Sequence, residues 1–136
     1  SGQAAPEVSY TTFDGVAVPL QPQGRPMLVN FWSSTCAPCV REMPELEKSY
    51  AANGDRVDYI GIDVVDAAEN GLRMIETTGA TYPMGRDPRG TIFAAYGGTN
   101  LPRTALLSAD GTILAVHSGE LDAGQLQAMI DEHLGR

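Results

Sequence analysis

Met27-Leu28-Val29-Asn30-Phe31-Trp32-Ser33-Ser34-Thr35-Cys36-Ala37-Pro38-Cys39 is the stretch that decides the fold of this 136-residue chain. Its first six residues are apolar apart from Asn30, a pattern typical of a strand buried on both faces. Cys36 and Cys39, the 2 cysteines of the chain, follow at the start of a helix-like segment. A disulfide between them would close almost no loop, so it would add little as a structural staple. The pair is therefore placed for dithiol–disulfide chemistry or for metal binding.

The segment from Cys36 to about Ala52 is predicted to be a helix, because its apolar residues recur every three or four positions along one face. These residues are Val40, Met43, Leu46 and Tyr50. Pro44 lies inside this helix and should kink it, since proline removes the hydrogen bond to the carbonyl of Val40.

The rest of the chain is predicted to alternate between strands and helices. Two strands at 8–13 and 16–20 flank Asp14-Gly15, a two-residue hairpin signal. Further strands are expected at 57–65, 104–108 and 112–118, and helices at 66–78, 91–96 and 122–134, with a short apolar piece at 82–84 and a turn at 86–90. Asp66 is expected to cap one helix that ends at Gly79, and Asp122 with Gln125 resembles a capping box for the last. Early strands that alternate with helices predict a parallel core, and the late hairpin adds antiparallel strands.

Composition restricts the class of protein. Hydrophobic residues make up 43% and charged residues 19% of the chain, which fits one ordinary globular domain. The net charge of −8 argues against nucleic acid, and the 9 scattered Lys and Arg residues do not suggest an anionic membrane surface. No apolar run approaches the ~20 residues of a membrane span. We expect residues 1–7 to be a tag scar and linker remnant, and residues 8–136 to be a single domain.

A zinc site is not expected. Cys36 and Cys39 would supply only two of the four usual ligands. His117 and His133 are too far apart in sequence to form a usual ligand pair with each other.

This order of elements, with Cys-x-x-Cys after the first core strand, resembles the thioredoxin fold, and more closely the TlpA/ResA/CcmG-type (DsbE-like) thiol–disulfide oxidoreductases. The resemblance is carried by residues 30–39, by Arg41-Glu42-Met43-Pro44-Glu45-Leu46, by the N-terminal hairpin, and by Leu101-Pro102-Arg103-Thr104. It implies an α/β fold of three α/β/α layers around a mixed sheet, with an N-terminal β-hairpin and a βα insertion. Two positions depart from thioredoxin itself: Asn30 replaces a buried aspartate, and Thr35 replaces a tryptophan.

Cys36 is expected to be the attacking thiol, because the N–H groups and dipole at a helix N-terminus stabilise a thiolate. Cys39, one turn later, would resolve the mixed disulfide after losing its proton. Pro38 fits the first helical turn, where its missing N–H costs nothing. Ala37-Pro38 lacks the histidine that strongly oxidising relatives use.

Glu42 lies three residues beyond Cys39 and is therefore its neighbour on a helix. Spacing alone favours a solvated glutamate that pairs with Arg41 or Lys48. The resemblance instead implies a functional acid that accepts the proton of Cys39. Asp63 and Asp66 are weaker acid candidates, and we expect them to be solvated or to cap a helix.

The resemblance also implies substrate-binding residues. Pro102 matches the family's cis-proline, which turns the backbone of Leu101 outward so that a peptide can pair with it beside Cys36. A trans proline that begins a strand is the alternative. Trp32 is expected to flank the active site, with core packing as its alternative, and Ala37 and Pro38 are expected to line it.

The resulting hypothesis is an extracytoplasmic, membrane-anchored or secreted thiol–disulfide oxidoreductase that reduces protein disulfides. It needs no cofactor beyond the Cys36–Cys39 redox-active disulfide. Apocytochrome c is one substrate class that the resemblance implies, with a membrane thiol donor of the CcdA/DsbD type as the electron source. We expect a monomer. The alternatives are an oxidant of secreted proteins, a peroxiredoxin-like peroxidase, for which Ser33 stands where a threonine is usual, and a non-catalytic binding module.

Overall fold

A seven-stranded mixed sheet forms the middle of the computed structural model, which describes residues 1–136. The strand order is β2-β1-β5-β4-β3-β6-β7. The strands are β1 (Ser9–Thr11), β2 (Ala17–Pro19), β3 (Met27–Trp32), β4 (Asp58–Val64), β5 (Met84–Asp87), β6 (Arg103–Leu107) and β7 (Ile113–Ser118). As the alternation of elements predicted, β3, β4 and β5 are parallel, while β6 and β7 are antiparallel to their neighbours.

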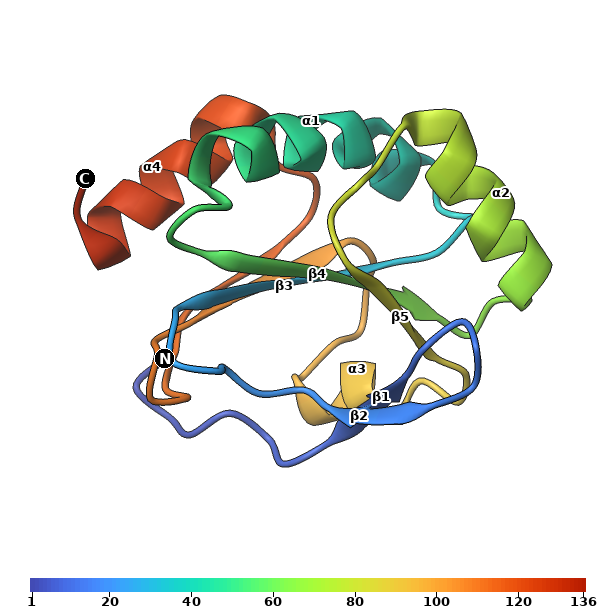
Figure 1. The fold of residues 1–136 in the computed structure, drawn as a ribbon, viewed down its shortest axis with the longest axis horizontal. Helices are drawn as coiled ribbons and strands as arrows, with labels where there is room; N and C mark the ends of the chain where they lie inside the picture. Colours follow the sequence, from blue (N-terminus) through green and yellow to red (C-terminus); the bar gives the residue numbers. More distant parts are fainter.

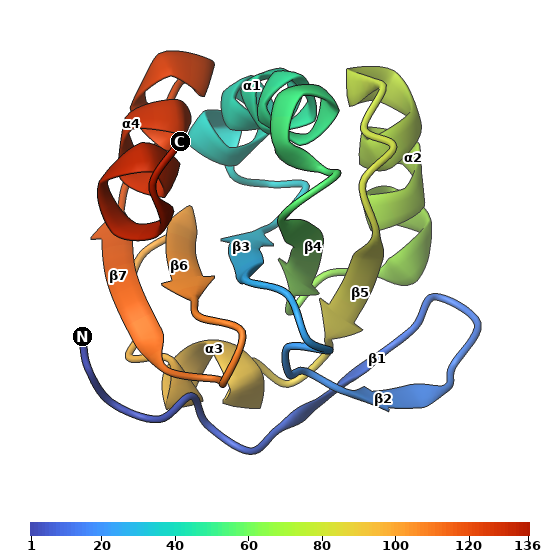
Figure 2. The same ribbon diagram turned by 60° about the vertical axis from the view of Figure 1, so that its left-hand side comes forward.

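Helices cover both faces of this sheet. They are α1 (Ala37–Asn53), α2 (Ala68–Thr78), α3 (Thr91–Ala95) and α4 (Ala123–Leu134). Helices α4, α1 and α2 lie side by side on one face, and the short α3 lies on the other with the β1–β2 hairpin (Figures 1 and 2). The predicted three-layer α/β/α arrangement is therefore present. None of these helices combines the length and the apolar composition that a membrane span requires.

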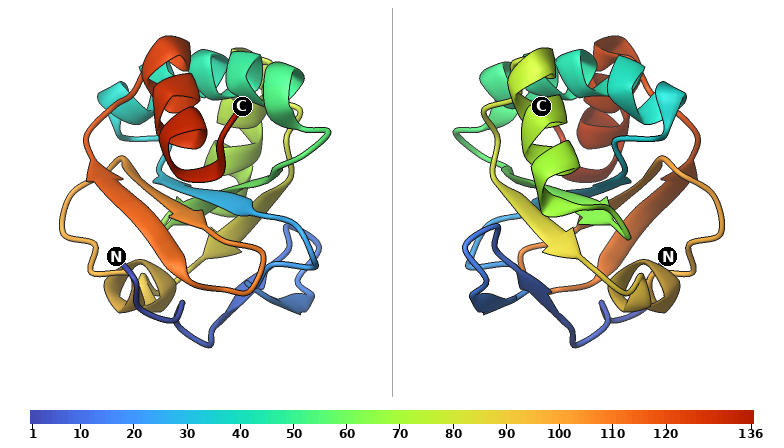
Figure 3. Two further views of the ribbon diagram at one scale, coloured as in Figure 1. Left: turned by 90° about the vertical axis from the view of Figure 1, so that its left-hand side faces the viewer. Right: turned by 90° about the vertical axis from the view of Figure 1, so that its right-hand side faces the viewer.

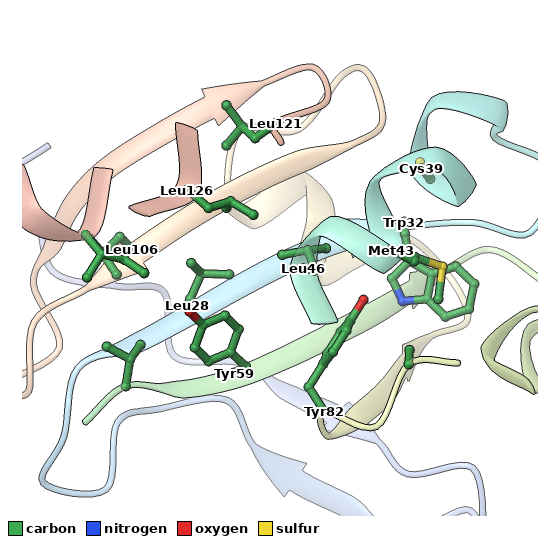
Figure 4. Close-up of a cluster of buried hydrophobic side chains, with 13 residues drawn as sticks. Leu28, Trp32, Cys39, Met43, Leu46, Tyr59, Tyr82, Leu106, Leu121 and Leu126 are labelled. Carbon is green, nitrogen blue, oxygen red and sulfur yellow. The ribbon is translucent and has the colours of Figure 1, made fainter. Parts of the chain in front are cut away.

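The core divides into two clusters because side chains of a strand alternate between the faces of the sheet. On β3, Leu28 and Trp32 point to the face under α1 and α4, and Val29 and Phe31 point to the face under α3. Figure 4 shows the first cluster, in which Met43 and Leu46 of α1 lie over the strands. Strand β3 is buried on both faces as its composition predicted.

Several predicted boundaries are wrong. The first hairpin closes with a wider loop than a two-residue turn, because Thr12 and Val16 still pair, with Thr12 N donating to Val16 O over 2.8 Å. Residues 84–87 form β5, although the sequence predicts a turn at Arg86 and Asp87. This strand has no apolar pattern, because Met84 is its single apolar side chain and Arg86 and Asp87 are charged.

The helix ends fit the predictions in part. Gly79 ends α2 in the left-handed conformation, with φ at 74°. The Asp122–Gln125 capping box opens α4. Asp66, however, does not cap α2, whose N-cap is Ala67, because the Asp66 carboxylate binds Ser34 instead. Helix α1 continues through Pro44.

The N-terminal residues, predicted to be a scar and linker, lie along the start of β7 at the edge of the sheet. Gly2 N donates to Ile113 O over 2.7 Å, and Ala5 N donates to Gly111 O over 2.8 Å. Ordered contacts therefore begin before residue 8, and the N-terminus lies beside the lower end of β7 (Figure 3).

Gly61 makes the close packing at the centre of the sheet possible. A Cβ atom added there would lie 2.6 Å from Met84 Sδ, 3.0 Å from Trp32 Nε1 and 3.1 Å from Tyr82 Cε2. These distances are shorter than van der Waals contact, so the surrounding side chains could not stay in place. The Trp32 ring therefore depends on the absence of a side chain at Gly61.

We expect Gly61→Ala to lower the free energy of unfolding by about 1–3 kcal/mol, the usual cost of overpacking. Gly124→Ala is the matched control, because its Cβ would meet only Asp122 Oδ1 at 3.4 Å in the first turn of α4. This control should be neutral or stabilising by about 0.4–1 kcal/mol. Urea unfolding of the three proteins checks both values, and equal stability of Gly61→Ala and wild type would contradict the packing argument.

Candidate active site

The two cysteines lie where β3 leads into α1 and form a disulfide in this structure. Cys36 is the N-cap of α1, and its sulfur accepts a hydrogen bond from Cys39 N over 3.2 Å. Cys36 is partly exposed, whereas Cys39 has no exposed surface. An incoming thiol or disulfide can therefore reach Cys36 but not Cys39.

The N-terminus of α1 favours a thiolate on Cys36. The first N–H groups of a helix have no partner within it and carry the positive end of the helix dipole. Pro38 sits in the first turn, where the lack of an N–H is tolerated. Once the disulfide is reduced, the negative charge of a Cys36 thiolate would face these donors.

The Glu42 carboxyl is buried beneath α1, with 1% of the residue exposed. Asn30 Nδ2 on β3 donates to Glu42 Oε1 over 2.8 Å, and Leu121 N, before α4, donates to Glu42 Oε2 over 2.7 Å. Asn30 Nδ2 also donates to Thr104 Oγ1 on β6 over 3.2 Å. The prediction from spacing alone, that Glu42 is solvated, is therefore wrong. Because Cys39 and Glu42 are both buried and one helical turn apart, they share the inner side of α1.

Burial raises the pKa of Glu42 to about 7, although the hydrogen bonds from Leu121 and Asn30 oppose this effect and the charge of Glu120 adds to it. A carboxyl group with this pKa is present in both protonation states near neutral pH. It is suited to exchange a proton, because general acid–base catalysis works best when the pKa lies near the working pH.

An exposed ion pair lies next to this buried acid. Arg41 Nη2 and Glu120 Oε1 are 2.7 Å apart. This ion pair connects the first half of α1 to the loop before α4, in which the backbone N–H of Leu121 donates to Glu42. Exposed pairs of this kind contribute little stability by themselves. The buried hydrogen bond from Leu121 N to Glu42 Oε2 is the interaction that links this loop to the core.

Pro102 precedes β6, and the Leu101–Pro102 peptide bond is cis, as predicted. The antiparallel register pairs Phe31 with Arg103, which puts Pro102 beside the end of β3 that leads to Cys36. Pro102 is buried and Leu101 is partly exposed. The fold therefore brings the predicted proline and the dithiol to the same end of the sheet.

Trp32 does not lie on the rim of the site, which corrects its prediction as a substrate-binding residue. Its side chain is fully buried in the cluster under α1, so its alternative role, core packing, is the one observed (Figure 4). Ala37 and Thr35 are exposed beside Cys36, and Pro38 is partly exposed. These small side chains leave the surface around Cys36 open.

Asp63, which sequence reasoning expected to be solvated or capping, is instead 1% exposed. Asp66 reaches back to the loop before Cys36, where its Oδ2 accepts from Ser34 N over 2.9 Å. The signal that could have identified Asp63 is its place among the apolar residues Ile60, Ile62 and Val64 near the end of β4. No group of three or more His, Cys, Asp or Glu side chains is arranged to hold a metal ion.

A partly exposed cysteine at a helix N-terminus, a shielded second cysteine and a cis-proline beside them define a thiol–disulfide oxidoreductase of the thioredoxin fold. The chain belongs to the Redoxin family, whose model matches residues 1–131. The Redoxin assignment and the geometry of the site thus agree on a redox protein.

Named relatives describe the same activity. The chain is 29% identical over 136 residues to the thiol-disulfide oxidoreductase ResA of Halalkalibacterium halodurans, covering 98% of this chain and 75% of that protein. It is 31% identical over 134 residues to the thioredoxin-like protein YneN of Bacillus subtilis, covering 96% and 78%. A solved thiol:disulfide interchange protein of the thioredoxin family from Chlorobium tepidum has a TM-score of 0.82 and 25% identity, covering 99% of this chain and 98% of that one.

Glu42 should make stability fall as pH rises. Its pKa of about 7 in the folded protein exceeds the ordinary 4.5, so the folded state holds a proton that the unfolded state loses between these values. The free energy of unfolding of the disulfide form should therefore drop from about pH 4.5 to pH 7, by up to ~3 kcal/mol from this group. Glu42→Gln should remove that part of the slope, measured by urea unfolding at several pH values.

Glu76→Gln provides the control, because Glu76 is an exposed glutamate on α2. It should leave the pH dependence of stability as in the wild type. A Glu42→Gln protein with the full wild-type slope between pH 4.5 and 7 would show that Glu42 is ionised in the folded state at these pH values.

Proposed function

We propose that this domain acts outside the cytoplasm as a reductant of protein disulfides, with Cys36 as the attacking thiol, Cys39 as the resolving thiol and Glu42 as the proton acceptor. The observation that carries the proposal is the buried Glu42 carboxyl one helical turn from Cys39.

In the proposed reaction, the Cys36 thiolate attacks one sulfur of a substrate disulfide and releases the other as a thiolate. Cys39 then passes its proton to Glu42 and attacks the sulfur of Cys36. The Cys36–Cys39 disulfide forms, and the second substrate thiolate leaves and is protonated by water. Two electrons move from the enzyme dithiol to the substrate, and a further dithiol must restore the enzyme.

The charges near the dithiol support the proposed direction of electron flow. A strong oxidant has a stabilised thiolate in its reduced form. A buried carboxylate close to the thiols disfavours a thiolate, because like charges repel at short range in a medium of low dielectric. Ala37 and Pro38 add no positive charge that would offset this effect. These features support a reductant over an oxidant of secreted proteins.

Leu101 and Pro102 would bind the substrate. A peptide that pairs with the backbone of Leu101 as an added strand would place its disulfide next to Cys36. The location and the partners rest on the family resemblance, which favours apocytochrome c as substrate and a membrane dithiol protein as electron donor. A monomer suffices for this chemistry, because every proposed residue comes from one chain.

The reduction potential of the Cys36–Cys39 couple tests the proposed direction. Equilibration with dithiothreitol and glutathione buffers should give a value nearer to the about −270 mV of thioredoxin than to the about −120 mV of DsbA. Glu42→Gln should raise this potential by roughly 10–30 mV, since it removes a charge that opposes the thiolate. A wild-type potential close to −120 mV would overturn the reductant proposal.

Trapping tests the substrate class. Purified apocytochrome c with an oxidised Cys-x-x-Cys-His motif should form a stable mixed disulfide with reduced Cys39→Ala protein, because Cys36 attacks and no second thiol releases the product. Cys36→Ala is the matched control and should form none, since Cys39 is shielded. Non-reducing electrophoresis and mass spectrometry give the readout. Absence of an adduct with Cys39→Ala would argue against this substrate.

A further inference from the structure

The end of β4 holds a buried carboxyl group that has no part in the reaction described above. Asp63 pairs with Trp32 on β3 and with Arg86 on β5. Neither of its carboxyl oxygens has a hydrogen-bond donor within reach. An ionised carboxylate buried without a donor is very unfavourable, whereas a protonated one needs only an acceptor for its hydroxyl. The surroundings of Asp63 therefore fit the protonated form.

The space for this carboxyl is provided by a glycine in α2. A Cβ atom added at Gly71 would lie 2.0 Å from Asp63 Oδ2 and 3.3 Å from Phe13 Cε2. Glycine within a helix is less favourable than alanine, because it loses more conformational freedom on folding. Helix α2 thus carries an unfavourable residue at the position that faces the Asp63 carboxyl.

Asp66 lies close enough to Asp63 for the two carboxyl groups to influence each other's pKa, and it binds the active-site loop. Its Oδ2 accepts from Ser34 N over 2.9 Å, and its Oδ1 accepts from Ser34 Oγ over 2.8 Å. Ser34 lies in residues 33–35, the loop between β3 and Cys36. Two bonds from one carboxylate to one loop residue fix both the position and the rotation of that loop.

The pKa values of the two carboxyl groups move apart. Burial, followed by the interaction with Asp66, raises the pKa of Asp63 to about 8, while the charge of Arg86 opposes the rise. Burial also acts on Asp66, but the interaction with Asp63 and the hydrogen bonds from Ser34 outweigh it and lower the pKa of Asp66. One proton shared unequally by two nearby carboxyls produces this pattern.

The backbone between these residues is held in an uncommon conformation. Val65 has φ at 45°, in the left-handed region that a β-branched residue rarely adopts. The residue is 63% exposed, so burial does not compensate for the conformation. Val65 N donates to Asp87 O over 3.0 Å, and Arg86 Nη2 donates to Asp66 O over 3.0 Å. Such conformations persist where the surrounding contacts impose them, often at functional sites.

We propose that Asp63 is a positioning residue for the dithiol: its protonated carboxyl donates to Asp66, and Asp66 in turn holds the 33–35 loop that presents Cys36. The ionisable groups that face Asp63 are Asp66 in the β4–α2 loop and Arg86 on β5. Gly71 of α2 and Trp32 of β3 also lie beside Asp63, with Phe13 of the β1–β2 loop near Gly71, and none of these three residues titrates. Loss of the proton would place two carboxylates side by side and loosen the grip on Ser34.

The Ser34 amide signal in an NMR titration of the disulfide form from pH 5 to 10 tests this linkage, because the bonded cysteines cannot titrate. The wild-type Ser34 amide should shift with a midpoint near pH 8. Asp63→Asn should abolish this shift, since the amide still donates to Asp66 but has no proton to lose. Glu42→Gln is the matched control: it should keep the Ser34 transition and remove the one at the Leu121 amide near pH 7.

The rate at which dithiothreitol reduces the Cys36–Cys39 disulfide at pH 7 gives the functional readout. Asp63→Asn should react within about twofold of wild type. Asp63→Ala, which lacks the donor, should be slower by about tenfold, less than the ~100-fold that a 1 Å misplacement can cost. A Ser34 transition that persists in Asp63→Asn, or an unchanged rate in Asp63→Ala, would overturn the proposal. If Asp63→Ala does not fold, the Ser34 titration of Asp63→Asn decides alone.

Discussion

The buried Glu42 carboxyl is the constraint on which the arrangement of the site depends. It needs hydrogen-bond donors inside the core, and the fold supplies them from Asn30 on β3 and from the backbone of Leu121 before α4. Strand β3 and the segment before α4, which are distant from each other in sequence, must therefore meet under the first turns of α1. The same placement puts an acid with a pKa of about 7 beside the shielded Cys39. Glu42 therefore both connects α1 to its neighbouring elements and is available for proton transfer in the redox reaction.

Polar residues on the face of the sheet that α1, α2 and α4 cover form a second pattern. Asn30, Asp63 and Thr104 are buried on three neighbouring strands, among side chains that are otherwise apolar. Buried polar groups are costly unless they are paired, so they are retained where they orient something. Asn30 and Thr104 are joined by hydrogen bonds to each other and, through Asn30, to Glu42 of α1, and we propose that Asp63 acts on the loop before α1.

Much of this fold could be predicted from the sequence, because β3 and α1 have strong apolar patterns and the capping box of α4 is a local signal. Strand β5 escaped prediction because Arg86 and Asp87 look like turn residues, and only pairing with β4 makes them a strand. The burial of Glu42 needed the family resemblance, since helical spacing alone favours a solvated side chain. The roles of Trp32 and Asp63 depend on what packs against them, which no local pattern encodes.

The pairing of residues 2–5 with the start of β7 has a geometric consequence. Strand β6 runs from Arg103, near the dithiol, to Leu107 at the far end of the sheet, and Thr112 follows the turn at that far end. Ala4 pairs with Thr112, so the N-terminus is fixed on the side of the domain opposite Cys36. If the domain were coupled to an electrode or a bead through Ser1, it would be attached by the side opposite Cys36. Its redox-active surface would therefore face the solution.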